Sequence, residues 1–459
     1  MHPRHFLTCT LLAICALAPW TPAQATNLVI ATVDNAQMLQ MRALSSQFEK
    51  AHPGTRIRWV VLDEHALRQY VSADIITRGR EFDIVTIGMY ETPLWARRNM
   101  IEPFQPQPGY DEKDLIPAIR KGLSYRGRLF AAPLYGESSM LFYRKDLMRA
   151  AGQSMPAHPT WKGIAALAEK LNDPLRGIHG ICLRGKPGWG ENMSLVTTMV
   201  NAFGGQWFDM RWNPQLQSSP WKKAVGLYVE LLRKYGPANA SRLGYNGNLK
   251  LFSQGHCALW VGATVAAGDL TDPDKSSVAA EVGFAPAPVA VTSRGSHWLW
   301  AWALAIPTDI DAAHRTLAQQ FLNWATSRDY VQQVAAHYGW GLVPPGTRRS
   351  TYAHAAYRAA APWADLQLQA IDSADPDHPT LPPSPYVGVQ YVQIPDFAPI
   401  GNMVGRYISR ALAGKISVDR ALSRSQRITQ RMMSLAGYPM AGHPEAQPSR
   451  HAQVPPHGS

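Results

Sequence analysis

The chain has 459 residues, of which 46 % are hydrophobic and 17 % charged, and this composition excludes a disordered or collagen-like protein for the bulk of the chain. Its length suffices for two to four domains of roughly 100–200 residues each. The formal net charge is +12, but Lys and Arg are dispersed along the chain and form no clustered basic stretch, so no nucleic-acid partner is expected.

The first 25 residues have the three parts of a secretory signal. Arg4 supplies the positive start, residues 6–17 form an apolar run, and Ala23-Gln24-Ala25 is a small-x-small cleavage site. A lipid anchor is not expected, because Ile14 rather than a small residue precedes Cys15. No later stretch reaches the run of about 18 apolar residues that a membrane-spanning helix needs. The sequence therefore predicts a signal peptide over residues 1–25, cleaved after Ala25, and a periplasmic mature protein.

Strands and helices alternate at the start of the mature chain. Apolar runs predict buried strands, and apolar residues spaced three or four apart predict helices that pack on them. The elements predicted here are strands over residues 28–33, 57–62 and 82–87, a helix carrying Met38, Met41, Leu44 and Phe48 on one face, and a helical stretch over 67–76. Such alternation is typical of a parallel, doubly wound sheet.

The same alternation resumes beyond Gly136. The elements predicted there are a helix with Thr160 as its N-cap, strands over 180–183 and 257–261, a helix from Ser219-Pro220 to Tyr235, and a helical segment over 248–253. One continuous sheet would be unusual for a chain of this length, so the sequence predicts an α/β protein with two lobes.

Proline-rich segments indicate where the chain passes between the lobes. Residues 283–289 contain too much proline for a central strand and are predicted to be an extended crossover. With crossings near residues 133–138, 284–292 and 342–347, one lobe comprises residues 26–135 plus 288–343 and the other 136–287 plus 344–440.

The remaining elements belong to the second half of the chain. A strand over 298–304 places Trp298, Trp300 and Trp302 on one face, because strand side chains alternate. Helices are predicted over 312–325, 328–338 and a last region, 404–436. Residues 441–459 contain few apolar side chains that could pack into a core and are predicted to be a disordered tail.

Two cysteines remain after the signal peptide. Cys182 and Cys257 each lie in an apolar, strand-like segment. In an oxidising compartment they can form a disulfide, but buried free cysteines are also common, so both alternatives stay open. Neither has the neighbouring Cys or His that a zinc site requires, and no metal site is expected.

Ligand positions are predicted from strand ends and from aromatic residues in polar loops. Ligands of open α/β sheets bind beyond the carboxyl ends of the strands. Aromatic faces pack against the C–H groups of sugars and polyols, while carboxylates and amides bind the hydroxyls. Trp189, between Gly188 and Gly190, is expected to have little local packing and to be free to stack on a solute. The predicted ligand-binding residues are Asn35, Glu64, Tyr90, Glu91, Glu137, Trp189, Glu191, Asn192, Trp260, Trp298 and Trp300.

Each of these residues also has an ordinary structural explanation. An isolated carboxylate is commonly a solvated surface charge and an isolated Trp is commonly part of the core. Their shared placement at strand ends is what favours a binding site.

Signatures of catalysis are scarce. The sequence has no GxSxG elbow, no P-loop and no GxGxxG that opens a helix after a strand, and no cofactor is expected. Carboxylates such as Glu91, Glu137 and Glu191 could form an acid–base pair acting on a glycoside. An exported carbohydrate-active enzyme therefore remains the alternative to a binding protein without catalytic residues.

An ordered series of segments resembles a known family. Pro187-Gly188-Trp189-Gly190-Glu191-Asn192 and Trp298-Leu299-Trp300-Ala301-Trp302 belong to it, together with residues 82–93, 135–139, 180–185, 207–210 and 385–391. Together they make residues 28–438 similar to the bacterial extracellular solute-binding proteins of ABC transporters, in the sorbitol/mannitol-binding branch.

The resemblance implies a type II periplasmic-binding-protein fold with a ligand cleft between two hinged lobes. It also implies capture of a polyol or related sugar, delivery to membrane permease subunits, and no turnover. A monomer is expected. Two positions depart from the family pattern near the expected cleft: Gly262 stands where an Asp is usual, and Asp34-Asn35 stands where an Asn pair is usual.

Overall fold

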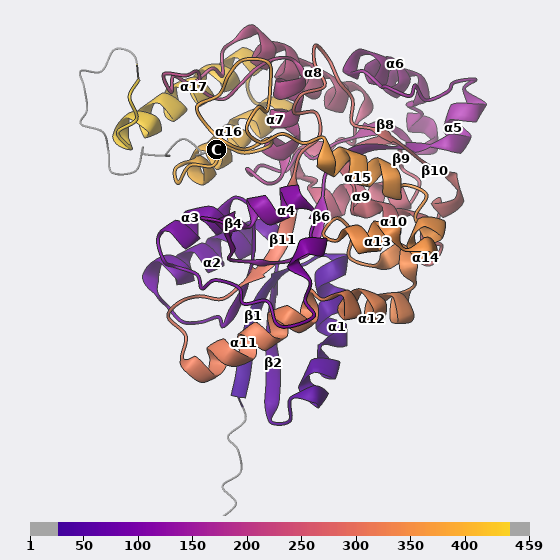
Figure 1. The fold of residues 1–459 in the computed structure, drawn as a ribbon. Coiled ribbons are helices and arrows are strands. Elements are labelled where there is room, and N and C mark those ends of the chain that lie inside the picture. The colour runs from indigo at the N-terminus through magenta and orange to yellow at the C-terminus, as the bar shows by residue number, and fades with distance from the viewer. Residues whose placement is uncertain (1–25, 441–459) are drawn as a thin grey trace, which may run out of the picture.

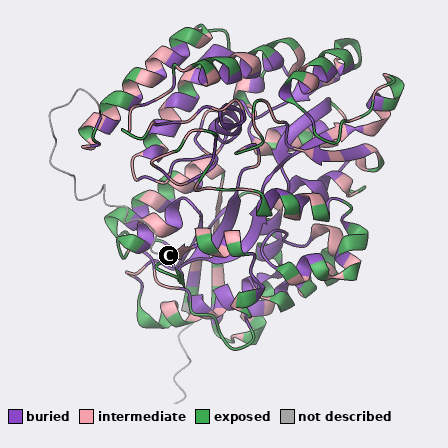
Figure 2. Ribbon diagram, turned by 45° about the horizontal axis from the view of Figure 1, so that its top comes forward, coloured by how far each residue is buried: buried purple, intermediate pink, exposed green. Residues whose placement is uncertain are grey.

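The computed structural model describes residues 26–440, so the predicted signal peptide and C-terminal tail lie outside the described residues. Two β-sheets, each covered by helices, form the two lobes (Figure 1). Most strand residues of both sheets are buried, whereas the helices show exposed residues on their outer faces (Figure 2). No helix within residues 26–440 is both long and apolar enough to span a membrane.

The first lobe contains a five-stranded sheet in the order β2-β1-β3-β11-β6. Strand β1 runs parallel to β2 and β3, but β11 runs antiparallel to β3 and β6. The parallel arrangement predicted from the first three strands is therefore confirmed, whereas β11 makes the complete sheet mixed. Its elements are β1 (Thr26–Val33), α1 (Ala36–Ala51), β2 (Thr55–Leu62), α2 (Glu64–Thr77), β3 (Ile84–Gly88), α3 (Glu91–Arg97), α4 (Pro117–Gly122), the small hairpin of β4 (Ser124–Tyr125) and β5 (Arg128–Leu129), β6 (Ala132–Glu137), β11 (Trp300–Ala305), α11 (Ala312–Ala325) and α12 (Arg328–Tyr338).

The second lobe contains a four-stranded sheet in the order β10-β7-β9-β8. Only β8 and β9 are parallel there. Its strands are β7 (Ser139–Arg144), β8 (His179–Cys182), β9 (Cys257–Ala263) and β10 (Val282–Pro286), and its helices include α5 (Lys145–Ala150), α6 (Trp161–Leu171), α7 (Asn192–Ala202), α8 (Ser219–Tyr235), α9 (Tyr245–Ser253) and α10 (Ala266–Thr271).

The C-terminal part of the chain adds further helices. They are α13 (Arg349–Ala353), α14 (Ala355–Ala360), α15 (Ala364–Asp372), α16 (Phe397–Leu412) and α17 (Val418–Leu435). Helices α16 and α17 pack against α7 and α8 of the second lobe (Figure 1). The single helical region expected over 404–436 is thus a helical pair. The break follows α16, where Gly414 has a positive φ of 72° that ordinary residues rarely adopt.

Three segments connect the lobes. Strand β6 of the first sheet leads through Ser138 directly into β7 of the second. The proline-rich segment was expected to be an extended crossover throughout. Its first part is instead the strand β10, and the chain passes between the lobes only after it, in residues 287–299. As an edge strand that pairs only with β7, β10 tolerates Pro286 at its end.

The third connection lies beside the first. The Gly136 N–H donates to Pro345 O at 2.8 Å, and the Ile116 N–H donates to Thr347 O at 2.8 Å. Side-chain-free Gly136 and Gly346 let the two backbones touch, because a Cβ on either would overlap the other's backbone. The residue-level boundaries of the lobes remain predictions.

The sequence left open whether the two cysteines of the mature chain form a disulfide or remain free, and the structure contains the disulfide. Cys182 of β8 and Cys257 of β9 are bonded, with their Cα atoms 5.9 Å apart. The bond joins two neighbouring strands across 75 residues of sequence.

Candidate functional site

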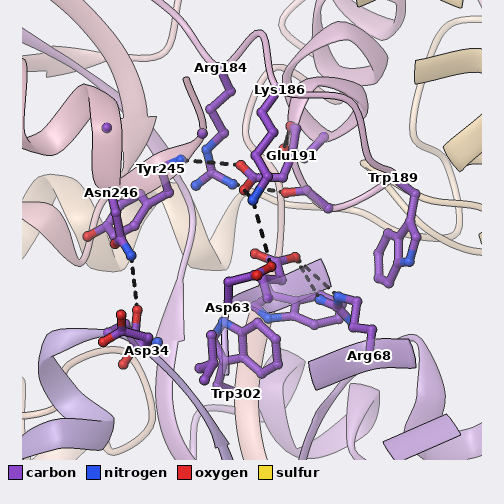
Figure 3. A pocket seen from close by; sticks show the side chains of 18 of the residues that line it. Asp34, Asp63, Arg68, Arg184, Lys186, Trp189, Glu191, Tyr245, Asn246 and Trp302 are labelled. Carbon is purple, nitrogen blue, oxygen red and sulfur yellow. Dashed lines mark hydrogen bonds and ion pairs between the residues drawn. The ribbon is translucent and has the colours of Figure 1, made fainter. Parts of the chain in front are cut away.

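A cavity of about 280 Å³ lies between the lobes (Figure 3). Both sheets contribute to it through strand ends and the loops that follow them. Its lining comprises Val33, Asp34, Asn35, Asp63, Glu64, Arg68, Tyr135, Glu137, Arg184, Lys186, Trp189, Gly190, Glu191, Ser194, Arg242, Leu243, Gly244, Tyr245, Asn246, Gly247, Trp298, Trp300, Trp302 and Gln390.

Most of the predicted ligand-binding residues come together in this lining. They are Asn35, Glu64, Glu137, Trp189, Glu191, Trp298 and Trp300. Trp302 joins them: Trp300 and Trp302 alternate along β11, whereas Trp298 lies in the segment before this strand, which starts two residues later than expected. Of the strand ends, those at Asn35, Glu64 and Glu191 therefore border the cavity.

Two predicted residues lie elsewhere and have structural roles. Trp260 is fully buried and stacks on Phe142 at 5.2 Å between ring centres, so it belongs to the core of the second lobe. Asn192 is fully buried too; its side chain accepts from the Gly188 N–H and donates to Gly405 O. It therefore holds the loop that carries Trp189 against α16.

Tyr90 and Glu91 also lie outside the lining. The Tyr90 hydroxyl donates to Ile394 O at 2.9 Å, which ties the end of β3 to the segment before α16. Glu91 accepts from the Gly88 N–H at 3.1 Å and pairs with Arg68, so it supports a residue of the cavity wall without reaching the cavity.

Gly262 does not line the cavity either. It lies in β9, where a Cβ would overlap the ring of Trp260. The expectation that this departure from the family pattern lies near the ligand was wrong, because the Trp260 ring occupies the space beside it.

The first lobe contributes strand ends that also start helices. Asn35 follows β1 and caps α1 by accepting from the Met38 N–H at 3.0 Å, while its amide donates to the Tyr135 hydroxyl at 2.8 Å. Asp63 follows β2 and caps α2 in the same way. These N-caps hold the side chains at the cavity edge.

An arginine surrounded by tryptophans forms part of the wall. Arg68 lies one helical turn after Glu64 and pairs with both Glu64 and Glu91. Its guanidinium lies 4.1 Å from the ring centre of Trp189, 4.9 Å from Trp300 and 4.7 Å from Trp302. Cation–π attraction is strongest for Trp and for desolvated cations, so the three rings stabilise the buried guanidinium.

Trp189 is more firmly packed than the sequence indicated. It is only 4 % exposed, and its ring lies 4.9 Å from Tyr90 and 5.7 Å from Trp300 between centres. The expectation of little local packing was wrong, because residues distant in sequence surround the loop. An edge of Trp189 still borders the cavity.

The second lobe contributes a buried guanidinium. Arg184 follows β8, donates from Nη1 to Gly190 O at 2.9 Å, and stacks over Tyr245 and Trp298 at 5.2 and 5.3 Å. It is 6 % exposed, and its Nε has no hydrogen-bond partner among the described residues. A buried donor without a partner is costly, so Nε is a candidate to bind a ligand oxygen.

Two buried carboxyls face this arginine. Burial raises the pKa of Glu137 to about 7, with Glu64 adding to the shift and Arg184 opposing it. Burial and the nearby Glu64 likewise raise the pKa of Glu191, against Arg184 and Lys186. At neutral pH these groups can therefore either donate or accept a hydrogen bond.

Contacts between the lobes close the cavity. The Asn246 amide of α9 donates to Asp34 O at 3.0 Å (Figure 3). Lys186 Nζ lies 3.7 Å from Asp63 Oδ1 and 3.7 Å from Glu191 Oε1, so it spans both sides. The lobes are closed over the cavity in this structure.

Several charged residues of the wall were not predicted from the sequence. Arg184 follows a strand end, a position that the strand-end rule covers, and Arg68 is four residues after the predicted Glu64 on the same helix face. The residues Lys186, Arg242, Tyr245 and Asn246 lie in loops or at a helix start and carried no comparable signal.

The wall alternates aromatic faces with groups that donate or accept hydrogen bonds. That combination suits an uncharged solute with many hydroxyls. The described residues contain no cluster of three His, Cys, Asp or Glu side chains that could hold a metal ion.

Comparison with known proteins identifies relatives along nearly the whole chain. A family model described as bacterial extracellular solute-binding protein matches residues 34–332. A mannitol-binding protein of Pseudomonas aeruginosa is 49 % identical over 430 residues, which are 94 % of this chain and 98 % of that protein.

Solved structures agree with this assignment. An ABC transporter solute-binding protein of Agrobacterium vitis S4 with bound D-mannitol has a TM-score of 0.88 at 48 % identity, covering 90 % of this chain and 99 % of that one. A solute-binding protein of Agrobacterium radiobacter K84 in complex with ribitol shares the fold, with a TM-score of 0.79 at 22 % identity over 89 % of this chain and 99 % of that one. This chain belongs to the bacterial extracellular solute-binding proteins.

Proposed function

We propose that this protein is the periplasmic receptor of an ABC transporter and that it captures mannitol or a closely related hexitol such as sorbitol. The observation that carries the proposal is the closed interlobe cavity, in which tryptophan faces alternate with buried carboxyls and a buried arginine. The likeness to proteins that bind D-mannitol over almost the whole chain supports the same ligand class.

The size and chemistry of the cavity favour a single small polyol. Its volume of about 280 Å³ is near the lower end of ligand pockets, which leaves little room for an oligosaccharide. Trp298 and Trp300 offer faces for the carbon chain, while Arg184, Glu137 and Glu191 can bind hydroxyls. A charged solute would add an unpaired charge to a wall whose charges already face one another.

Retention follows from lobe closure. The solute enters the open cleft and touches both lobes, and those contacts exist together only in the closed form, so binding shifts the population toward closure. The closed form is then the state that permease subunits receive. The same proposal includes a monomeric protein, export by the N-terminal signal and release of the ligand unchanged.

Isothermal titration with mannitol, sorbitol, ribitol and glucose tests the proposal. We expect one site per chain, with mannitol or sorbitol bound most tightly. A matched titration with an amino acid is the control. Heat from the amino acid and none from any hexitol would rule out the proposed ligand class.

The enzyme alternative is tested on the same material. Prolonged incubation with hexitols and oligosaccharides should return every compound unchanged by chromatography, and no new reducing ends should form. Release of reducing ends that depends on Glu137 would favour a glycoside hydrolase instead.

A further inference from the structure

We propose that Gly190 is a positioning residue for ligand retention. Its missing side chain lets a loop of the second lobe settle against the Glu64–Arg68 ion pair of the first lobe, and this contact sets how tightly the cleft closes. The inference rests on the proposed function, because lobe closure matters only if the protein holds a ligand in the cleft.

The first-lobe side of the contact is fixed. Glu64 Oε1 accepts from Nε and Nη2 of Arg68, each at 3.1 Å. Arg68 also donates to Glu91, which in turn accepts from the Gly88 N–H at the end of β3. Glu64 therefore cannot turn aside without breaking two charge-assisted hydrogen bonds.

The second-lobe side is fixed as well. The Gly190 carbonyl accepts from Arg184 Nη1 at 2.9 Å, and the Trp189 N–H donates to Asn402 Oδ1 of α16 at 3.0 Å. The loop thus moves with the second lobe. From there the Trp189 ring reaches across to lie 4.1 Å from the Arg68 guanidinium.

Gly190 lies at the point of closest approach. A Cβ at this position would overlap Glu64 Oε1 and would lie 3.5 Å from Arg68 Nη2. The backbone of Gly190 does not require glycine, since it is not among the positive-φ glycines. What excludes a side chain here is a group of the opposite lobe.

The substitution Gly190→Ala therefore separates closure from folding. In the open form the added methyl group meets no opposing carboxylate, and neither lobe is strained. In the closed form it collides with Glu64, and overpacking of this kind weakens a fitted contact by about ten- to a hundredfold.

The effect should appear in the dissociation rate. Ligand enters the open form, so the association rate constant should change little, while a loosened closed form releases ligand faster. We expect Gly190→Ala to raise koff for mannitol by about tenfold or more and to raise Kd by the same factor. Stopped-flow measurement of intrinsic tryptophan fluorescence gives both rate constants.

The control is another Gly→Ala substitution in the second lobe. Gly226 lies in α8, and a Cβ there meets no atom within 4 Å. Gly226→Ala should leave both rate constants unchanged. Melting of both ligand-free variants should show that the fold is intact.

A double-mutant cycle identifies the partner. Glu64→Ala removes the carboxylate with which the new methyl group collides, so adding Gly190→Ala to that background should raise koff much less than it does in the wild type. If Glu64→Ala abolishes binding, the cycle cannot be completed, and X-ray scattering at saturating mannitol replaces it. The single variant Gly190→Ala should then have a larger radius of gyration than the wild type.

The possible failures are distinguishable. A Gly190→Ala protein with wild-type koff and wild-type scattering would overturn this inference while leaving the proposed function intact. An equal increase in koff with and without Glu64 would also overturn it. If the wild-type protein binds no hexitol, the proposed function is wrong, and this inference falls with it before any variant is made.

Discussion

Single residues set the electrostatics of the cavity. Glu137 and Glu191 are each 7 % exposed, and both face Arg184, with Glu64 and Lys186 nearby. Burial disfavours the charged carboxylate more than the basic residues favour it, so both carboxyls hold their protons to higher pH than in an unfolded chain. The cavity wall therefore contains two groups whose protonation changes close to neutral pH.

This shift predicts a pH dependence of stability. The pKa of Glu137 is about 7 in the folded protein but near 4.5 in the unfolded chain, so the folded state binds the extra proton between these values. The free energy of unfolding should then fall as pH rises from about 5 to about 7 and level off above that range. In Glu137→Gln this decline should be smaller. Melting of the ligand-free proteins between pH 5 and 8 measures it.

A surface carboxylate provides the control for this experiment. Glu230 is an exposed residue of α8 paired with Lys234, so Glu230→Gln should keep the wild-type pH profile. Parallel profiles for the wild type and Glu137→Gln would show that Glu137 does not retain its proton in the folded protein.

Among the elements, the pair of β8 and β9 depends on a covalent link. β8 has only four residues and lies at the edge of its sheet, yet it leads directly to Arg184 and the Trp189 loop. The Cys182–Cys257 disulfide joins it to β9. A short edge strand has few ladder hydrogen bonds, so a covalent link to its neighbour adds to its attachment.

Removing the disulfide should destabilise the protein without changing its ligand. We expect the double variant Cys182→Ala/Cys257→Ala to lose roughly 2–5 kcal/mol of unfolding free energy. Neither cysteine lines the cavity, so the order of preference among polyols should stay the same. Urea denaturation measures the loss.

Treatment with a reductant shows whether the loss of stability comes from the disulfide bond or from the packing of the two side chains. It should lower the denaturation midpoint of the wild type and leave the double variant unchanged. A variant as stable as the oxidised wild type would mean that the bond adds nothing to stability.

At the scale of the whole molecule, closure depends on the three connections between the lobes. The first and third are joined by the Gly136–Pro345 hydrogen bond, and the second leads into β11 with its tryptophans. Segments that lie side by side can rotate together with small backbone changes, as hinges do. The cavity-lining residues at the end of β6 and the start of β11 are next to these connections.

Ligand should therefore make the molecule more compact. The radius of gyration from X-ray scattering should decrease when mannitol is added to saturation and should not change with an amino acid. Identical curves with and without mannitol, in a protein that titration shows to bind it, would mean that the cleft is already closed without ligand.

The local elements can be predicted from the amino-acid sequence alone. Periodicity located β1, β2, β3 and the helices between them, because apolar spacing depends only on neighbours along the chain. Strand ends gave Asn35 and Glu64, since the carboxyl ends of strands lie beside the cleft in this class of fold, and the predicted first crossing gave Glu137. The ordered series of segments indicated the family that the comparisons confirmed.

Features that depend on contacts between distant residues could not be predicted from the sequence and became visible in the folded chain. The antiparallel direction of β11, the burial of Trp260 against Phe142, and the packing around Trp189 are set by partners far away in sequence. The same holds for the charged wall around Arg68 and Arg184. From sequence alone, an arginine is expected to be a solvated surface charge. Whether aromatic rings and carboxylates surround it depends on the fold, because burial and pairing are properties of the assembled molecule.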